Sequence, residues 1–193
     1  MSTTYYDKNA EAYIRSTINE DMSAARARFL RHVIPCGHIL DAGCGSGRDA
    51  RAFAQAGYTV AAFDGSAAMA RLAAAYAALP VLHLTFEHVA WRDAFDGIWA
   101  SASLLHVPRT DLPTVTDKLA SALRQGGALY VSLKSGSSDR EVDGRHFTDV
   151  TEPEIERLLT AAGLRLADLW SSADVRAGRT ETWVNAIGRR SEA

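Results

Sequence analysis

The sequence has few of the residues that build disulfide-rich folds or metal centres. Its 193 residues include two cysteines, Cys36 and Cys44, and five prolines. Two cysteines cannot form the framework of several bridges that stabilises small secreted domains, and they do not form a CxxC pair. The six histidines do not fall at the spacings of zinc sites, so we expect no metal site.

An excess of charge of either sign and a long apolar run are also missing. Lys and Arg number 21 and Asp and Glu number 23, which gives a net charge of −2. General nucleic-acid binders usually have a strong basic excess, so we expect no nucleic-acid partner. No run approaches the roughly 18 apolar residues that a membrane helix needs, and the first residues lack the layout of a signal peptide. We therefore expect a cytoplasmic protein without a membrane partner.

Short apolar runs alternate with longer amphipathic segments along most of the chain. We expect one domain over residues 1–193, in which residues 1–37 form a helical cap and residues 38–193 form the core. This alternation predicts an α/β fold, a Rossmann-like doubly wound seven-stranded sheet that is mostly parallel with an antiparallel last strand. The polar stretch 135–143 predicts a mobile loop over the site. The predicted strands are 38–42, 58–63, 81–86, 95–100, 128–133, 164–170 and 180–188, and the predicted core helices are 48–57, 66–79, 111–124 and 153–162.

A glycine-rich turn, DAGCGSGRD, follows the first predicted strand at residues 41–49. A dinucleotide site needs the spacing G-x-G-x-x-G, but Arg48 stands where the third glycine would fall, and Asp41 would repel a pyrophosphate. Asp64 ends the second predicted strand, close to the roughly 20-residue spacing of an acid that binds ribose. Ribose without pyrophosphate, together with a cationic group near Asp41, describes S-adenosylmethionine.

The sequence resembles the class I S-adenosylmethionine-dependent methyltransferases. Five segments carry the resemblance in the order and spacing of the family: ILDAGCGSG (39–47), TVAAFDGS (59–66), FDGIW (95–99), LLHV (104–107) and LRQGGAL (123–129). The chain is most similar to the bacterial small-molecule branch, which includes the tellurite-resistance methyltransferases. The resemblance implies an enzyme that transfers a methyl group, with S-adenosyl-L-methionine as its cofactor.

The resemblance also implies which residues bind the cofactor. Asp41 would lie near the methionine amino group, Gly43 and Gly45 beneath the cofactor, and Asp64 on the ribose. Tyr5, Tyr6 and Tyr13 occupy the part of the cap that folds over the methionine end in the family. The full set of expected cofactor residues is Tyr13, Asp41, Gly43, Gly45, Asp64, Gly65, Met69, Phe86, Glu87, Ser101 and Ala102.

One histidine and four cationic residues follow the later strands, on the side of the sheet where the cofactor is expected. His106 follows the fourth strand, Lys134 and Arg145 follow the fifth, and Arg176 and Arg179 lie between the last two. Positive charge would hold an anionic acceptor through charge-assisted hydrogen bonds, although nearby acids could instead pair with these cations. We expect a small anionic acceptor, either an oxyanion such as tellurite or a carboxylate. The candidate catalytic residues are His106, Lys134 and Arg145, with His106 as either a base or a pocket wall.

Other functions remain open at this point. Methylation of a macromolecule (a tRNA, an rRNA or a protein) is the second enzyme hypothesis, although the mild acidity and short length disfavour it. An NAD-dependent oxidoreductase is disfavoured by the glycine spacing. A non-catalytic cofactor-binding module is a further alternative. The chain could be a monomer or a homodimer, because an antiparallel last strand can form a dimer edge.

Overall fold

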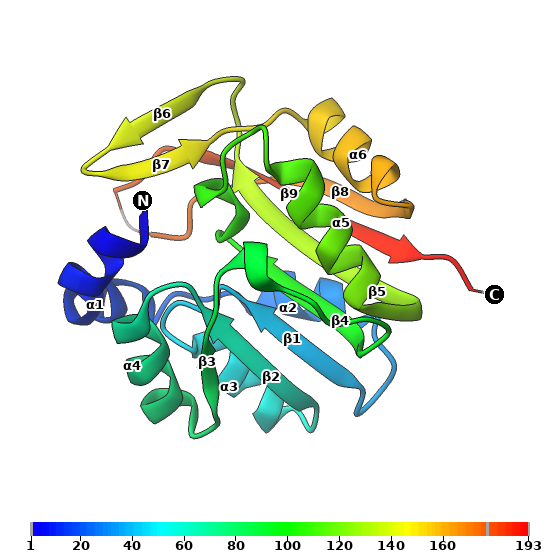
Figure 1. The fold of residues 1–193 in the computed structure, drawn as a ribbon, viewed down its shortest axis with the longest axis horizontal. Helices are drawn as coiled ribbons and strands as arrows, with labels where there is room; N and C mark the ends of the chain where they lie inside the picture. The colour runs from blue at the N-terminus through cyan, green and yellow to red at the C-terminus, as the bar shows by residue number, and fades with distance from the viewer. Residues whose placement is uncertain (1, 177, 193) are drawn as a thin grey trace.

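The computed structural model describes residues 2–176 and 178–192, as a helical N-terminal segment followed by an α/β core (Figure 1). The N-terminal segment contains two helices, α1 (Ser2–Thr17) and α2 (Ser23–Leu30). None of the helices in these residues combines the length and the apolar character needed to cross a membrane. The core elements are β1 (His38–Ala42), α3 (Arg48–Gln55), β2 (Thr59–Asp64), α4 (Ala67–Ala77), β3 (Val81–His83), β4 (Phe95–Ser101), α5 (Leu112–Ala122), β5 (Leu123–Lys134), β6 (Asp139–Val142), β7 (Arg145–Thr148), α6 (Glu152–Ala161), β8 (Leu164–Ala173) and β9 (Thr182–Arg190).

Seven strands form one twisted sheet in the order β3-β2-β1-β4-β5-β9-β8. The β1–β2, β1–β4, β2–β3 and β4–β5 pairs are parallel, and β9 runs antiparallel to both β5 and β8. This confirms the prediction of a mostly parallel doubly wound sheet with an antiparallel last strand. Because β1 pairs with β4 as well as β2, the strand order reverses beside β1, and crevices form at the carboxyl ends of the strands at such a position.

Helices cover both faces of the central strands, so both faces of β4 and β5 are apolar. On one face, Phe29 of α2 and Phe53 of α3 pack on Trp99 of β4, whose ring stacks on Tyr130 of β5 with 3.9 Å between centroids. On the other face, α5 buries aliphatic side chains against β5, and α6 packs on β8 and β9. This packing makes the central strands a rigid base for the loops at their carboxyl ends.

Residues 139–148 correct the prediction of a mobile loop over 135–143. They form a two-stranded hairpin, β6–β7, in which Asp139 pairs with Thr148 and Val142 pairs with Arg145. Asp143 and Gly144 both have positive φ angles, 52° and 73°. Positive φ at both central residues is the requirement of a type I′ turn, which Asp-Gly satisfies. The Arg109 guanidinium holds the base of the hairpin through the Asp139 carboxylate (3.0 Å) and the Asp149 carbonyl (2.7 Å).

Several element boundaries also differ from the predictions. The third strand ends at His83 instead of residue 86, because Phe86–His88 forms a short 3-10 helix. The helix predicted over 111–124 ends at Ala122, and β5 begins at Leu123 instead of residue 128. Gly126, with φ 75°, lies in the irregular first part of β5, where the register with β4 shifts.

Candidate functional site

The glycine turn after β1 is packed so closely that side chains are excluded at two positions. A Cβ atom at Gly43 would lie 2.6 Å from the Ser103 Cβ, and one at Gly47 would lie 2.9 Å from the Ala73 carbonyl oxygen. Both glycines have a φ of 75°, which other L-residues rarely adopt. The Gly43 amide donates to the Phe63 carbonyl at 3.0 Å. The turn is therefore held against the ends of two neighbouring strands, with its backbone open to a ligand.

Asp41 is buried at the end of β1, with 2% of its surface exposed. Its Oδ2 atom has no hydrogen-bond partner among the described residues. Burial, and then the neighbouring charge of Asp49, raise the pKa of the Asp41 carboxyl well above its usual range. A bound cation would relieve this destabilised charge, so the site fits a ligand with an ammonium group.

Asp64 ends β2 and is held by two backbone amides. Its Oδ2 accepts from the Gly45 amide and its Oδ1 from the Ser66 amide, both at 2.9 Å. Burial raises the pKa of Asp64 to about 6 even though these hydrogen bonds act in the opposite direction. The two amides orient the carboxylate and leave lone pairs that can accept from hydroxyl groups of a ligand.

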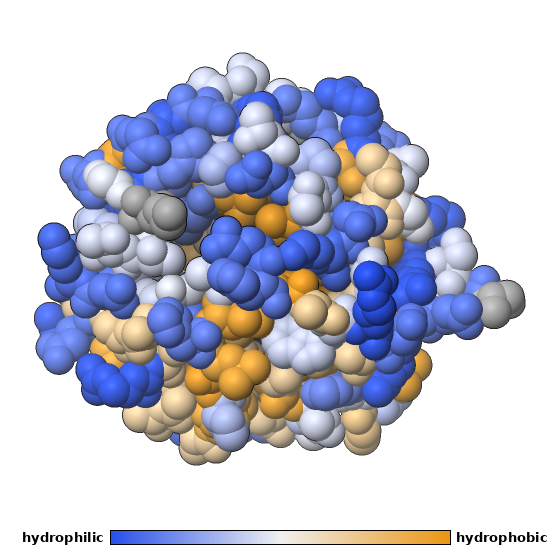
Figure 2. Space-filling model, in the orientation of Figure 1, coloured by the Kyte–Doolittle hydropathy of each residue, from blue (hydrophilic) through white to orange (hydrophobic). Residues whose placement is uncertain are grey.

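Two adjoining cavities lie over the carboxyl ends of the strands. The larger has a volume of about 700 Å³ and the smaller about 350 Å³. In the orientation of Figure 1, Figure 2 shows apolar side chains at and below the middle of the view, with hydrophilic side chains above them and to either side. All fourteen residues predicted for the site line these cavities. Asp64, Gly65, Met69, Phe86 and Glu87 line the larger, Asp41, Ser101, Lys134 and Arg145 line the smaller, and Tyr13, Gly43, Gly45, Ala102 and His106 line both.

Polar contacts hold the N-terminal helix α1 beside these cavities. The Asp7 carboxylate accepts from the Ser66 hydroxyl at 2.5 Å and from the Ala68 amide at 3.2 Å, at the start of α4. At the other end of α1, the Arg48 guanidinium donates to the Thr17 carbonyl at 3.0 Å. These contacts hold Tyr6 and Tyr13 of α1 in the cavity wall.

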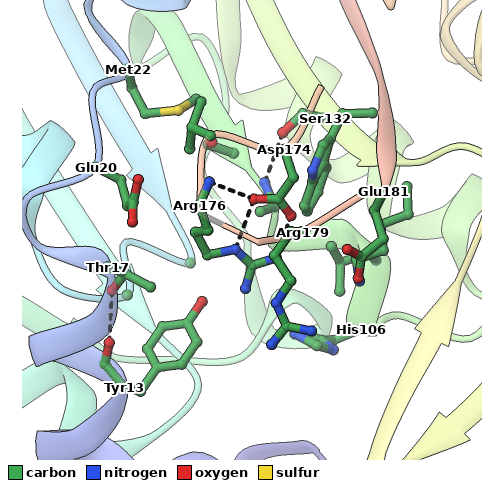
Figure 3. A pocket seen from close by; sticks show the side chains of 18 of the residues that line it. Tyr13, Thr17, Glu20, Met22, His106, Ser132, Asp174, Arg176, Arg179 and Glu181 are labelled. Atoms are coloured by element: carbon green, nitrogen blue, oxygen red, sulfur yellow. Dashed lines mark hydrogen bonds and ion pairs between the residues drawn. The ribbon is translucent and has the colours of Figure 1, made fainter. Parts of the chain in front are cut away.

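Several cations converge on the smaller cavity, and most of them are paired. Lys134 donates to Glu181 at 2.8 Å, and Arg176 forms an ion pair with Asp174 at 2.5 Å. The Arg176 guanidinium holds the pKa of Asp174 down at about 2, against the effect of burial. Figure 3 shows the Arg179 side chain extending into the cavity. Within the described part of the chain, the Arg179 side chain forms no hydrogen bond or ion pair.

Arg145 lies between aromatic rings at the start of β7. Its guanidinium carbon is 4.3 Å from the centroid of the Tyr5 ring and 5.2 Å from that of Phe147. Its nearest carboxylate, Asp143, is 3.4 Å away and its side chain is 71% exposed. Among the described residues, the buried Nε–H of Arg145 has no acceptor. Arg145 therefore keeps donor capacity for an anionic group in the cavity.

His106 lies where the two cavities meet. Its Nε2 is 2.7 Å from the Tyr6 hydroxyl, and its Nδ1 is 2.7 Å from the His146 carbonyl oxygen. Burial, together with the charges of Arg145 and Lys134, lowers the pKa of His106 to about 4. The imidazole is therefore neutral at pH 7.

Two members of the site were not singled out from the sequence. Arg140 of β6 lines the smaller cavity and forms an ion pair with Asp149 at 2.7 Å. Tyr6 was recognised only as a residue of the cap. The Asp143-Gly144 dipeptide could have predicted the hairpin that carries Arg140. No local sequence pattern predicts the contact between Tyr6 and His106. No cluster of metal-ligating side chains is found in the residues that the structure describes.

Residues 39–127 match the family model described as a methyltransferase domain. This segment contains the glycine turn, Asp64 and His106. No match is found among curated proteins.

Solved structures of similar fold include methyltransferases with bound cofactor. The 1,6-didemethyltoxoflavin-N1-methyltransferase of Burkholderia thailandensis, with bound 1,6-didemethyltoxoflavin and S-adenosylhomocysteine, has a TM-score of 0.80 at 22% identity and covers 98% of this chain and 85% of its own. The magnesium protoporphyrin IX methyltransferase of Synechocystis PCC 6803, with bound S-adenosylmethionine, has a TM-score of 0.78 at 18% identity. The match covers 98% of this chain and 95% of that chain. A structure of the complex between the Haloferax volcanii Trm112 methyltransferase activator and a methyltransferase contains a chain that matches with a TM-score of 0.81 at 18% identity. The match covers 100% of this chain and 99% of that chain.

The cavities of this chain fit S-adenosylmethionine chemically. The orphaned carboxylate oxygen of Asp41 suits an ammonium group, Asp64 suits ribose hydroxyls, and a side chain at Gly43 would obstruct the turn. The matched methyltransferase domain contains these three features. The chain therefore contains a methyltransferase domain, matched over residues 39–127, whose cavities suit S-adenosylmethionine.

Proposed function

We propose that this enzyme methylates a small acceptor that carries an anionic group, either an oxyanion such as tellurite or a carboxylate. The observation that carries the proposal is Arg145, which lines a cavity of about 350 Å³ and whose buried Nε–H has no acceptor among the described residues. A cavity of this size suits a small molecule. A guanidinium binds carboxylates and oxyanions through charge-assisted hydrogen bonds.

The residues that line the two cavities have separate tasks in the proposed mechanism. When bound, S-adenosylmethionine supplies an electrophilic methyl group. Asp41 would hold its ammonium group, and Asp64 would hold its ribose. Arg145, with Lys134 and Arg179, would orient the acceptor, and the cap tyrosines Tyr6 and Tyr13 would exclude water. Alignment of the two reactants supplies most of the acceleration in such a displacement.

A macromolecular acceptor is the alternative proposal. A structure of similar fold, with a TM-score of 0.81, comes from a complex with a methyltransferase activator. Against this alternative, the cations of the present site line a small cavity, which suits a small acceptor. An affinity for tRNA that falls steeply with salt would favour the macromolecular acceptor.

The test is a screen of oxyanions and carboxylates as acceptors, followed by kinetics of Arg145→Gln and Lys134→Gln. Loss of a charge-assisted hydrogen bond costs roughly 1.5–3 kcal/mol, so we expect the KM for the acceptor to rise about 10- to 100-fold. Arg71→Gln, which removes an exposed arginine of α4, is the matched control and should keep the parent KM. If both site variants keep the parent KM, the anionic acceptor is excluded.

A further inference from the structure

The hydrogen bond between Tyr6 and His106 joins the N-terminal helix to the centre of the site. The two residues are 100 positions apart, and the Tyr6 hydroxyl lies 2.7 Å from the His106 Nε2. Both residues line both cavities. The bond therefore lies where the two cavities meet, between the residues expected to hold the cofactor and the cations expected to hold the acceptor.

The hydrogen-bond partners of His106 determine where its proton lies. The His146 carbonyl oxygen, 2.7 Å from Nδ1, can only accept, so Nδ1 carries the proton. Because burial lowers the pKa of His106 to about 4, the ring carries no second proton at pH 7. The Nε2 lone pair must therefore accept from the Tyr6 hydroxyl.

The surroundings keep Tyr6 in its hydroxyl form. Burial raises the pKa of Tyr6, and the neighbouring Tyr13 and Asp64 act in the same direction, while Arg145 opposes them. His106 is faced by Arg145 and His146 of β7 and by Lys134 of β5. In the resting protein the hydroxyl thus donates to His106, and its oxygen, which lies beside the Arg145 guanidinium, keeps a lone pair that can accept from another donor in the cavity.

We propose that Tyr6 and His106 form a proton relay that deprotonates the acceptor during methyl transfer. The acceptor would react as a protonated nucleophile, such as a hydroxyl or an N–H group. A lone pair of its nucleophilic atom forms the bond to the methyl carbon, and the electron pair of the carbon–sulfur bond passes to sulfur, which loses its positive charge. The proton of the nucleophilic atom moves to the Tyr6 oxygen, and the former Tyr6 proton moves to the His106 Nε2. The resulting imidazolium later releases its proton to water.

A weak base is sufficient for this step. The attacking atom gains positive charge as its bond to carbon forms, so its proton becomes acidic enough for a neutral imidazole to accept. The positive charges of Arg145 and Lys134 also favour return of the imidazolium to its neutral form after each turnover. The relay depends on the methyl transfer of the proposed function, but it does not depend on whether the acceptor carries an anionic group.

The kinetic test compares Tyr6→Phe and His106→Asn with the parent enzyme, using the acceptor found in the screen. General acid–base catalysis typically contributes 10²- to 10⁴-fold, so we expect kcat to fall at least about 100-fold in each variant. The KM for the acceptor and the Kd for S-adenosylhomocysteine should change less than about threefold. Tyr58→Phe removes a tyrosine hydroxyl outside both cavities and should keep the parent kcat. An unchanged kcat in Tyr6→Phe, or a change confined to KM, overturns the relay.

A second measurement uses the ligand-free protein and needs no acceptor. Nitrogen-15 NMR of the imidazole at pH 7 should show His106 neutral, with a protonated Nδ1 and an unprotonated Nε2. The Nε2 resonance should move in Tyr6→Phe and stay in place in Tyr58→Phe. A proton on Nε2 overturns the relay whatever the acceptor proves to be. If an uncharged acceptor is methylated with a kcat that depends on Tyr6, the relay holds and the anionic acceptor fails.

Discussion

At the residue scale, the two carboxylates expected to hold the cofactor differ in how their burial is compensated. Asp64 accepts hydrogen bonds from the Gly45 and Ser66 amides, and its pKa rises only to about 6. Asp41 has an oxygen without a partner among the described residues, lies beside Asp49, and has a pKa raised well above the usual range. The uncompensated charge of Asp41 costs folding free energy that a cationic ligand can recover.

Replacement of Asp41 by Asn should therefore stabilise the ligand-free protein and weaken cofactor binding. A carboxyl whose pKa is raised by folding loses stability as the pH rises through the folded pKa, and Asn removes that loss. We expect the variant to be more stable at pH 8 by on the order of 1–3 kcal/mol, and the difference to shrink toward pH 4. Denaturant unfolding at both pH values measures this, and calorimetry should show at least about tenfold weaker binding of S-adenosylhomocysteine.

The matched control for this prediction is Asp117→Asn on the exposed face of α5. It should change neither the unfolding free energy nor cofactor affinity. A lower stability of Asp41→Asn at pH 8 would show that the Asp41 carboxylate is compensated in the ligand-free protein.

At the scale of elements, part of the site comes from segments that pack on the sheet instead of joining it. Helix α1 carries Tyr6 and Tyr13, and the β6–β7 hairpin carries Arg140 and Arg145. Asp7 holds α1 on the first turn of α4, where a negative charge also favours the exposed amides of the helix end. The contacts at the ends of these elements therefore control the shape of the cavities.

Replacement of Asp7 by Ala should loosen α1 without unfolding the core. Loss of a carboxylate from a helix start typically costs about 1 kcal/mol, and Ser66 still caps α4 through the Met69 amide. We expect faster proteolysis within α1 and several-fold weaker binding of S-adenosylhomocysteine. Glu11→Ala is the control, since its pair with Arg15 spans 3.8 Å between side chains that are more than 70% exposed. Equal proteolysis of the two variants would contradict the role of Asp7.

At the scale of the whole molecule, the strand order brings distant segments to one edge of the sheet. The turn after β1, the ends of β2 and β4, and the loop between β8 and β9 all line the cavities. Because the cofactor would contact both the cap and the core, its binding should stabilise the folded chain as a unit.

S-adenosylhomocysteine should therefore raise the melting temperature. A ligand at one hundred times its Kd adds about 2.7 kcal/mol of stability, which corresponds to roughly 5–11 °C for a chain of this length. Differential scanning fluorimetry of the parent and of Asp64→Ala checks this, with NAD⁺ as the control ligand. A shift with NAD⁺ instead of S-adenosylhomocysteine would contradict the assignment of the cofactor.

Local sequence was sufficient to predict the sheet and to locate the glycine turn and the two carboxylates beside it. Strand and helix periodicity is visible within each segment, and the acid that follows the glycine turn lies at a spacing set by one strand–helix–strand unit. The hairpin was missed although its signal, Asp143-Gly144, is also local. The polar composition of residues 135–143 was instead interpreted as a loop.

Only the tertiary structure decided which charges in the site are already paired and which donors stay available. Lys134 meets Glu181 and Tyr6 meets His106 across 47 and 100 positions of chain, while the Arg145 Nε–H has no partner in the described part of the chain. Such pairings depend on distances between elements that are remote in sequence, and a change of an ångström or two makes or breaks a hydrogen bond. The sequence by itself thus determined the kind of enzyme, and the folded geometry decided how its acceptor cavity is charged and where a proton can move.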